Sequence, residues 1–138
     1  MMEFKFDIEG GDFSKAGIAS SEVKKILKQL NLAPNLIKRI AVAMYEAEVN
    51  IVAHAYKGKM YVTIDSDKVK MVFADEGPGI PDIEKAMQEG YSTASEEVRQ
   101  QGFGAGMGLS NIKRNSDQLT IKSEVGKGTT VEIETKIK

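Results

Sequence analysis

The strongest constraint on the fold is the apolar stretch between Pro34 and Tyr56, which is predicted to form one long helix. Pro34 suits the first turn of a helix, where its missing N–H costs nothing. Apolar residues cover one face of this helix and much of the opposite face: Ile37, Ile40, Met44, Ala47 and Ile51 on the first, and Val42, Tyr45, Val49 and Val52 on the second. A helix this apolar is expected to be buried on two sides, between a sheet and another helix.

The periodicity of the rest of the chain places the other elements around this helix. Alternation with period two predicts strands, and apolar residues at helical spacing predict helices. In chain order we expect a strand at 4–8, a helix at 14–30, the long helix, a hairpin of strands at 60–64 and 69–74, a short helix at 81–87, a helix at 107–115, and a hairpin of strands at 119–123 and 129–137. This order predicts an α+β fold, a two-layer sandwich whose mixed, mostly antiparallel sheet is covered on one face by helices.

Length and charge limit the classes of protein to consider. A chain of 138 residues predicts a single domain, 1–138, and its lack of cysteine excludes disulfide and thiolate chemistry. The 19 basic and 20 acidic residues are well mixed, so no basic stripe indicates a nucleic-acid partner. No signal-peptide pattern and no run of about 20 apolar residues is present, so we expect a cytoplasmic protein without a membrane partner.

Polar residues recur every fourth position along one edge of the long helix. Glu46, Asn50 and His54 share this edge, next to the apolar face, and could face a pocket between helix and sheet. An amide oxygen is a suitable ligand for Mg²⁺, and a carboxylate can orient or deprotonate a hydroxyl that attacks phosphorus. The alternative is that Glu46 and Asn50 are solvated helix-edge residues and that His54 is a structural histidine. Glu48 lies on a different side and is expected to face solvent.

A turn rich in acid and glycine follows an apolar strand. Asp75-Glu76-Gly77-Pro78-Gly79-Ile80 comes directly after Met71–Ala74. Glycines allow the backbone to approach a flat ligand, and a carboxylate can accept a hydrogen bond from an exocyclic amine. The alternative is an ordinary turn, in which Asp and Gly are common.

A second glycine-rich segment has no clear periodicity. We expect residues 89–106 to form a lid, and Gly102, Gly104, Gly106 and Gly108 lead into the helix at 107–115, where bare N–H groups could bind phosphate. The alternative is a plain flexible loop, because such spacing is a weak signal alone. Thr129 and Thr130 either offer a hydroxyl to a base or are simple strand formers, and Arg99 and Lys113 either counter phosphate charge or are surface residues.

Taken together and in this order, the motifs resemble the ATPase superfamily shared by gyrase, the Hsp90 chaperone, histidine kinases and the MutL repair protein. Glu46 and Asn50 resemble its N-box, Asp75–Gly79 its first glycine box, Gly104–Leu109 its second, and Gly126–Thr130 its closing G-x-G-T element. The small size and the stretch Ala86–Thr93 are similar to bacterial anti-sigma factors and switch serine/threonine kinases.

The resemblance implies a Bergerat-type ATP-binding fold, a role for individual residues, and the cofactors ATP and Mg²⁺. Glu46 would be the catalytic base or hydroxyl-positioning residue, and Asn50 would hold Mg²⁺. Asp75 would accept from the adenine amine. The remaining ATP-binding positions implied are His54, Gly77, Gly79, Ile80, Arg99, Gly104, Gly106, Met107, Gly108, Leu109, Thr129 and Thr130.

The resemblance also implies a partner. The leading interpretation is a serine/threonine protein kinase that phosphorylates an anti-anti-sigma protein with a STAS domain. The alternative is a non-enzymatic, nucleotide-gated binder that sequesters a sigma factor or another regulator, and a third interpretation is a detached ATPase module. The first strand either offers an edge for a homodimer or completes the sheet.

Overall fold

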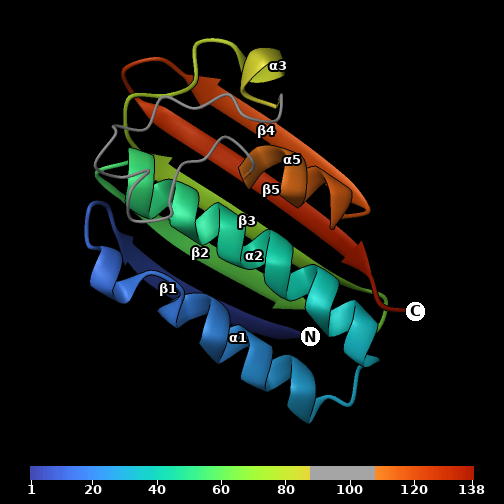
Figure 1. Ribbon diagram of the computed structural model, residues 1–138. Coiled ribbons are helices and arrows are strands. Elements are labelled where there is room, and N and C mark those ends of the chain that lie inside the picture. Colours follow the sequence, from blue (N-terminus) through green and yellow to red (C-terminus); the bar gives the residue numbers. More distant parts are fainter. Residues whose placement is uncertain (88–107) are drawn as a thin grey trace.

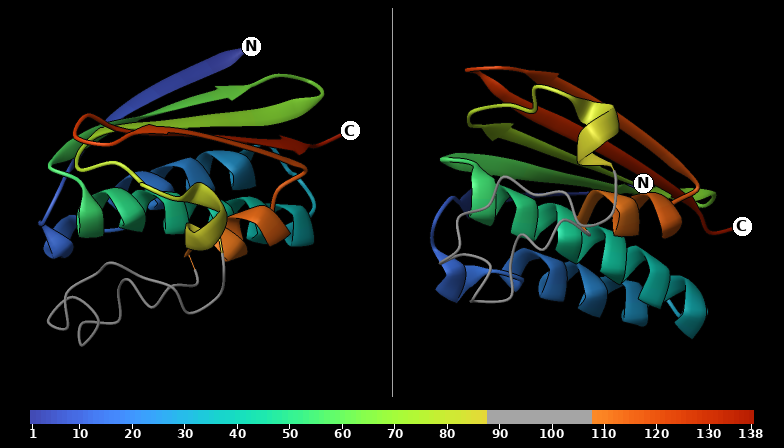
Figure 2. Two further views of the ribbon diagram at one scale, coloured as in Figure 1. Left: turned by 90° about the horizontal axis from the view of Figure 1, so that it is seen from above. Right: turned by 45° about the horizontal axis from the view of Figure 1, so that its top comes forward.

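The computed structural model describes residues 1–87 and 108–138. Four of the predicted site residues, Arg99, Gly104, Gly106 and Met107, lie outside the described residues, as does the predicted lid. All other candidate residues are placed. The described part has two layers, a sheet and a set of helices on one of its faces (Figures 1 and 2), which confirms the predicted α+β sandwich.

Five strands form the sheet in the order β1-β2-β3-β5-β4. Their bounds are β1 Met2–Glu9, β2 Lys57–Ile64, β3 Lys68–Glu76, β4 Gln118–Glu124 and β5 Gly128–Lys136. All four pairings are antiparallel, so the mixed sheet that we predicted contains no parallel pair among the described residues. Because β3 is central, the turn that follows it opens at the middle of one end of the sheet. β1 forms one edge of the sheet, and its role in a homodimer stays a prediction.

Three helices cover one face of the sheet: α1 Ile18–Gln29, α2 Pro34–His54 and α5 Gly108–Arg114. A short 3₁₀ helix, η1 at Phe13–Lys15, precedes α1, where the sequence predicted one continuous helix from residue 14. Gly17 explains the interruption, because its φ of 92° is left-handed and breaks the helical backbone before Ile18. The short helix α3, Ile83–Ala86, is capped by Asp82, whose side chain accepts the Lys85 N–H.

The long helix packs on the sheet as predicted, but α1 and α5 lie beside it in the same layer, and Tyr45 on its second apolar face is exposed. α2 lies beside α1 and α5 and packs on the sheet, and Ile40, Ala43 and Met44 are fully buried. β2 alternates buried residues with mostly exposed ones, and β3 alternates buried with half-buried ones. Met60, Met71 and Phe73 lie on the buried side and belong to the same core cluster as the buried residues of α2. A buried helix on a central strand gives the groups on α2 fixed positions relative to the Asp75 turn.

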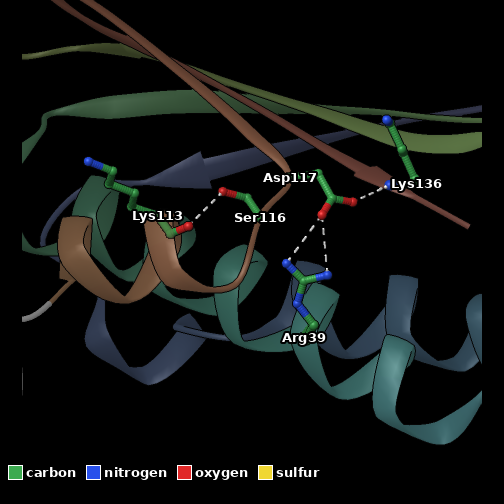
Figure 3. Close-up of polar contacts among 5 residues, drawn as sticks. All are labelled: Arg39, Lys113, Ser116, Asp117 and Lys136. Carbon is green, nitrogen blue, oxygen red and sulfur yellow. Dashed lines mark hydrogen bonds and ion pairs between the residues drawn. The ribbon is translucent and has the colours of Figure 1, made fainter.

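The far end of α2 is tied to the sheet by an exposed acid (Figure 3). Asp117, just before β4, accepts a hydrogen bond from the Lys136 backbone N–H at 2.7 Å. It also accepts hydrogen bonds from both terminal nitrogens of the Arg39 guanidinium at 3.5 Å. Beside it, the Ser116 hydroxyl donates to the Lys113 carbonyl at 3.4 Å. These contacts join α2, α5 and the two C-terminal strands at the end of the molecule away from the Asp75 turn.

Candidate functional site

The N-terminus of α5 meets the polar edge of α2. A Cβ added to Gly108 would lie 3.0 Å from the Asn50 Oδ1 and 3.4 Å from the Glu46 Oε2. Any larger residue at 108 would press on these two side chains. The structure therefore brings Glu46, Asn50 and Gly108 together, and Leu109 next to them packs against the core.

Glu46 is half-buried, and its surroundings change its acidity. Burial raises the pKa of the Glu46 carboxyl, while a hydrogen bond with the Asn111 side chain works in the opposite direction. A carboxylate with a raised pKa is a better proton acceptor than an exposed one. Asn111 lies one helical turn beyond Gly108 and was not among the residues that the sequence singled out.

Asp75 lies near the end of β3, next to the first residues of β5. Its Oδ1 accepts the Thr129 N–H at 3.0 Å, and its Oδ2 has no hydrogen-bond partner among the described residues. Burial raises the pKa of Asp75, and the Thr129 N–H opposes this shift. Within the part of the chain that the structure describes, one carboxylate oxygen is thus used by the fold and the other can accept a further hydrogen bond.

The structure also distinguishes the two threonines. Thr129 lies on the same face of β5 as the buried residues Val131 and Ile133 and is itself 8% exposed, so it faces the helix layer. Thr130 is half-buried and points to the opposite face of the sheet. Of the two candidates, only Thr129 shares a side of the sheet with the core and contacts Asp75.

The turn after β3 is fastened to the turn between β4 and β5. Gly77 donates its N–H to the Lys127 carbonyl at 3.1 Å, and Gly126 donates to the Pro78 carbonyl at 2.8 Å. Gly79 has a φ of +77°, and a Cβ there would lie 2.5 Å from the Glu124 carbonyl oxygen. The glycine at 79 is therefore required both by the backbone conformation and by the close approach of β4.

The predicted residue Ile80 contacts a side chain that the sequence did not indicate. Its N–H donates to the Ser123 Oγ at 2.7 Å, and this oxygen also lies 2.9 Å from the Thr129 Oγ1. A serine within a strand carries no distinguishing sequence signal, so the sequence did not predict a role for Ser123. Its contacts join the turn, β4 and β5 at one point.

α2 connects the two halves of the site. Glu46 and Asn50 meet Gly108, and just past the C-terminus of the helix a Cβ on Gly77 would lie 3.0 Å from the Ala55 Cα. Glu46 and Ala55 are separated by roughly 13 Å along the helix axis, at 1.5 Å per residue. His54, at the end of α2, is half-buried, and burial lowers its pKa, so the imidazole is neutral at neutral pH.

Glu48 corrects one of the sequence predictions. We expected this side chain to face solvent, but it is 2% exposed and faces α1. Its carboxylate accepts the N–H groups of Gly17 at 3.0 Å, Ala19 at 3.4 Å and Ser20 at 2.9 Å, and the Ser20 hydroxyl at 2.5 Å. Glu48 therefore supplies, from α2, the cap that the first turn of α1 lacks in its own sequence.

A groove of about 1220 Å³ runs between α1 and α2 on the side away from the sheet. Its lining includes three lysines, Lys24, Lys28 and Lys38, and it reaches Glu46. Asn50 and Asp75 do not line it. Glu46 is thus accessible from this groove as well as close to Gly108.

The sequence profile of the histidine kinase-like ATPase domain family matches residues 14–135, which include every placed site residue. The chain belongs to this family. It is 37% identical over 136 residues to an anti-sigma F factor from Caldanaerobacter subterraneus subsp. tengcongensis, covering 95% of this chain and 90% of the relative. It is 33% identical over 113 residues to the serine/threonine-protein kinase RsbT from Bacillus subtilis, covering 79% of each chain.

The fold of this family member is also found among solved structures. The mycobacterial sensor histidine kinase MprB superimposes with a TM-score of 0.57 over 98% of this chain and 97% of that one. Identity to it is 16%, so this likeness supports the fold alone. The two-layer sandwich of this chain is thus a fold also found in a solved histidine kinase.

Within residues 1–87 and 108–138, no helix combines the length and apolar character needed to cross a bilayer. These residues also contain no group of three or more His, Cys, Asp or Glu side chains that could hold a metal ion. A metal bound in this part of the chain would need ligands beyond such a cluster.

Proposed function

We propose that this member of the histidine kinase-like ATPase family is an ATP-dependent serine/threonine protein kinase that acts as an anti-sigma regulatory factor on a STAS-domain partner. The observation that carries the proposal is the placement of Glu46, with its raised pKa, beside Asn50 and Gly108. The anti-sigma F factor and RsbT relatives support both parts of the proposal.

Asp75 would bind the adenine of ATP. Its free Oδ2 can accept a hydrogen bond from an exocyclic amine, while Thr129 holds Oδ1 in place. Gly77 and Gly79 would let the base approach the backbone of the turn, and Ile80 would lie at its edge. The turn suits this role because its own backbone hydrogen bonds to the turn between β4 and β5 hold it in place.

Asn50 and Gly108 would lie at the phosphate end. Mg²⁺ usually takes only one or two protein oxygens and completes its shell with phosphates and water. The single amide oxygen of Asn50 fits that requirement, and no cage of acidic residues among the described part of the chain is needed. His54 would contribute as a neutral hydrogen-bonding group. We propose further ATP contacts at Leu109 and at the positions outside the described residues, Arg99, Gly104, Gly106 and Met107.

Glu46 would accept the proton from the attacking hydroxyl of the partner. Bound MgATP supplies the transferable phosphoryl group and the charge that neutralises it. Burial gives Glu46 its raised pKa, and the neighbouring Asn111 side chain would orient the carboxylate. The groove between α1 and α2 would give a segment of the partner access to Glu46.

The test is transfer of labelled phosphate from ATP to candidate STAS-domain proteins, followed by mapping of the modified residue. We expect phosphoserine or phosphothreonine on the partner with the wild-type protein, and strongly reduced transfer with Glu46→Gln. A partner that binds the wild-type protein stably with ATP but is never phosphorylated would contradict the kinase proposal.

The anti-sigma F factor relatives favour a second candidate, a nucleotide-gated binder that sequesters a sigma factor. Here ATP occupancy alone would control partner binding. Pull-down with ATP, ADP and no nucleotide separates the two candidates. Capture of a sigma factor that depends on nucleotide, with equal capture by Glu46→Gln, would support this second function.

A further inference from the structure

We infer that the groove between α1 and α2 docks the protein substrate, and that it selects a partner surface whose acidic side chains lie about 12 Å from the hydroxyl that receives phosphate. The inference rests on the proposed kinase function and adds the recognition chemistry of its substrate. Three features of the groove carry it: a group of lysines at one end, apolar side chains beside Glu46, and the spacing between them.

The two ends of the groove differ in charge because α1 and α2 run in opposite directions. The helices lie side by side and are joined by a short connection (Figure 1). The start of α1 meets the middle of α2, since a Cβ added to Gly17 would lie 3.0 Å from the Tyr45 Cε1. Lys28 and Lys38 therefore lie toward the connection, and Glu46 lies toward the opposite end of the groove.

Three exposed lysines form what we call the lysine end: Lys24 and Lys28 on α1, and Lys38 on α2. Within residues 1–87 and 108–138 none of them has an ion-pair partner, and the acid Glu22 in the same lining pairs instead with Lys25 at 3.5 Å. An alanine precedes α2 and no acid lies in its first turn, so the positive end of the helix dipole adds to this charge. Carboxylates are the side chains that such a surface attracts.

Apolar side chains line the groove beside Glu46. Tyr45 is 41% exposed and Ile18 is 57% exposed, and the half-buried Val42 lines the groove with them. Tyrosine is a frequent anchor of protein interfaces, because its ring buries a large area while its hydroxyl keeps a polar contact. The groove volume of about 1220 Å³ also exceeds the roughly 300–1,000 Å³ of small-molecule pockets. These features favour a protein surface over a small anion.

The spacing along α2 fixes the orientation of the partner. Lys38 and Glu46 are separated by about 12 Å along the helix axis, at 1.5 Å per residue. A partner hydroxyl at Glu46 would bring acids at this spacing onto the lysine end. Acids next to the hydroxyl would instead face the Glu46 carboxylate and be repelled. The groove therefore distinguishes partners by where their acidic side chains lie.

The test reverses one charge on each wall in Lys24→Glu/Lys38→Glu, and the probe is the STAS-domain protein that the wild-type protein phosphorylates. We expect its Kd and KM to rise on the order of tenfold at low salt, the effect of a few exposed charge pairs, with kcat unchanged. The rise should shrink at high salt, because screening weakens exposed charges. Lysine substitutions of the partner's acids at the predicted spacing should restore binding to the variant.

The matched control is Lys59→Glu/Lys122→Glu, which changes the net charge equally. Both lysines are exposed, and each precedes a strand residue that faces the helix layer, so they lie on the opposite face of the sheet. The control should keep the wild-type Kd and KM for the partner. Thermal unfolding verifies that every variant is folded, and calorimetry should show unchanged ATP affinity in all of them.

Tyr45 tests the apolar part of the groove. Tyr45→Ala should raise the Kd for the same STAS-domain protein roughly fivefold to thirtyfold, the usual effect of truncating an interface anchor. Tyr45→Phe keeps the ring and should bind more nearly like the wild-type protein. Equal binding by Tyr45→Ala and the wild-type protein would remove Tyr45 from the docking surface.

The outcomes separate the docking role from the proposed function. Wild-type protein that binds ATP but phosphorylates no STAS-domain protein would contradict the kinase function and the docking role with it. Wild-type phosphorylation with unchanged partner kinetics in Lys24→Glu/Lys38→Glu would overturn the docking role alone. Loss of ATP affinity in that variant would assign the lysines to the nucleotide, and conversion of a wild-type dimer to monomers, with partner binding unchanged, would assign the groove to a second copy of the chain.

Discussion

Glu46 and Glu48 lie two residues apart on α2, and their surroundings show how the same side chain can serve two purposes. Glu48 is 2% exposed and receives hydrogen bonds from three backbone N–H groups and a hydroxyl, all from the first turn of α1 and the residue before it. Glu46 is half-buried; among the described residues its carboxylate interacts with the Asn111 side chain, and burial is the larger influence on its pKa.

The comparison teaches that burial alone does not indicate a reactive acid. A buried charge that is fully hydrogen-bonded is stable where it lies, whereas a desolvated charge with few donors is available for a ligand or a proton. Glu48 therefore serves the fold, whereas the surroundings of Glu46 fit the chemical role that we propose for it. Asp75 resembles Glu46 in this respect, because within residues 1–87 and 108–138 only its Oδ1 has a hydrogen-bond partner.

The contrast between Glu46 and Glu48 is tested most strongly by Glu46→Gln, for which we expect the largest loss of activity. The amide cannot accept a proton, so phosphate transfer should fall about 10²–10⁴-fold, the usual contribution of a general base. ATP affinity and folding should change little. Single-turnover transfer to the STAS partner, with calorimetry for ATP, measures both, and Glu84→Gln on exposed α3 is the control. A variant with wild-type transfer would remove Glu46 from the mechanism.

Glu48→Ala should instead affect stability. It removes an acceptor from several buried donors at the start of α1, and a hydrogen bond to a charged group contributes about 1.5–3 kcal/mol. We expect the free energy of unfolding to fall by about 2–4 kcal/mol, measured by urea denaturation. Glu48→Gln, which keeps an acceptor oxygen, should lose less. If Glu48→Ala unfolded like the wild-type protein, the capping role would be wrong.

Asp75→Asn tests whether Asp75, like Glu46, has a role in the nucleotide site. Losing a charge-assisted hydrogen bond to the base costs about 1.5–3 kcal/mol, so ATP affinity should fall roughly tenfold to a hundredfold. Calorimetry provides the measurement, and the exposed neighbour in Glu76→Gln provides the control. Unchanged affinity would refute the adenine assignment.

The same variant has a pH signature. Because the pKa of Asp75 is raised in the folded protein, the native state binds more protons than the unfolded state between the ordinary and the raised pKa. The free energy of unfolding of the wild-type protein should therefore decline as pH rises through this interval. Asp75→Asn should show a smaller decline in urea titrations at a series of pH values. An identical pH dependence would mean that Asp75 is not desolvated in solution.

The smallest effect is expected for His54→Gln. The pKa of His54 is lowered by burial, so the unfolded state binds more protons between the lowered pKa and the ordinary value of 6.5. Wild-type stability should fall as pH drops through this interval, with the opposite sign to Asp75. His54→Gln should lessen that fall, as measured by urea denaturation across the interval. A steeper fall in the variant would contradict a buried, neutral imidazole.

Much of this architecture could be predicted because it depends on local patterns. The alternation of Phe4, Phe6 and Ile8 predicted β1, and the apolar residues between Pro34 and Tyr56 predicted the long helix α2. The expectation that both of its apolar faces are covered was wrong for Tyr45, which is exposed. The spacing of Glu46 and Asn50 placed both on one helix edge. Their proximity to Gly108 followed from the family resemblance and needed the structure to be seen.

The sequence alone determined the elements, the two-layer fold and the order of the motifs, because strand and helix periods record which side chains must be buried. Only the tertiary structure decided the fate of individual polar groups. It turned Glu48 inward onto α1, chose Thr129 over Thr130, and joined Ser123 to Ile80. The physical reason is that a polar side chain is satisfied by donors and acceptors distant in the chain, and periodicity carries no record of where those partners lie.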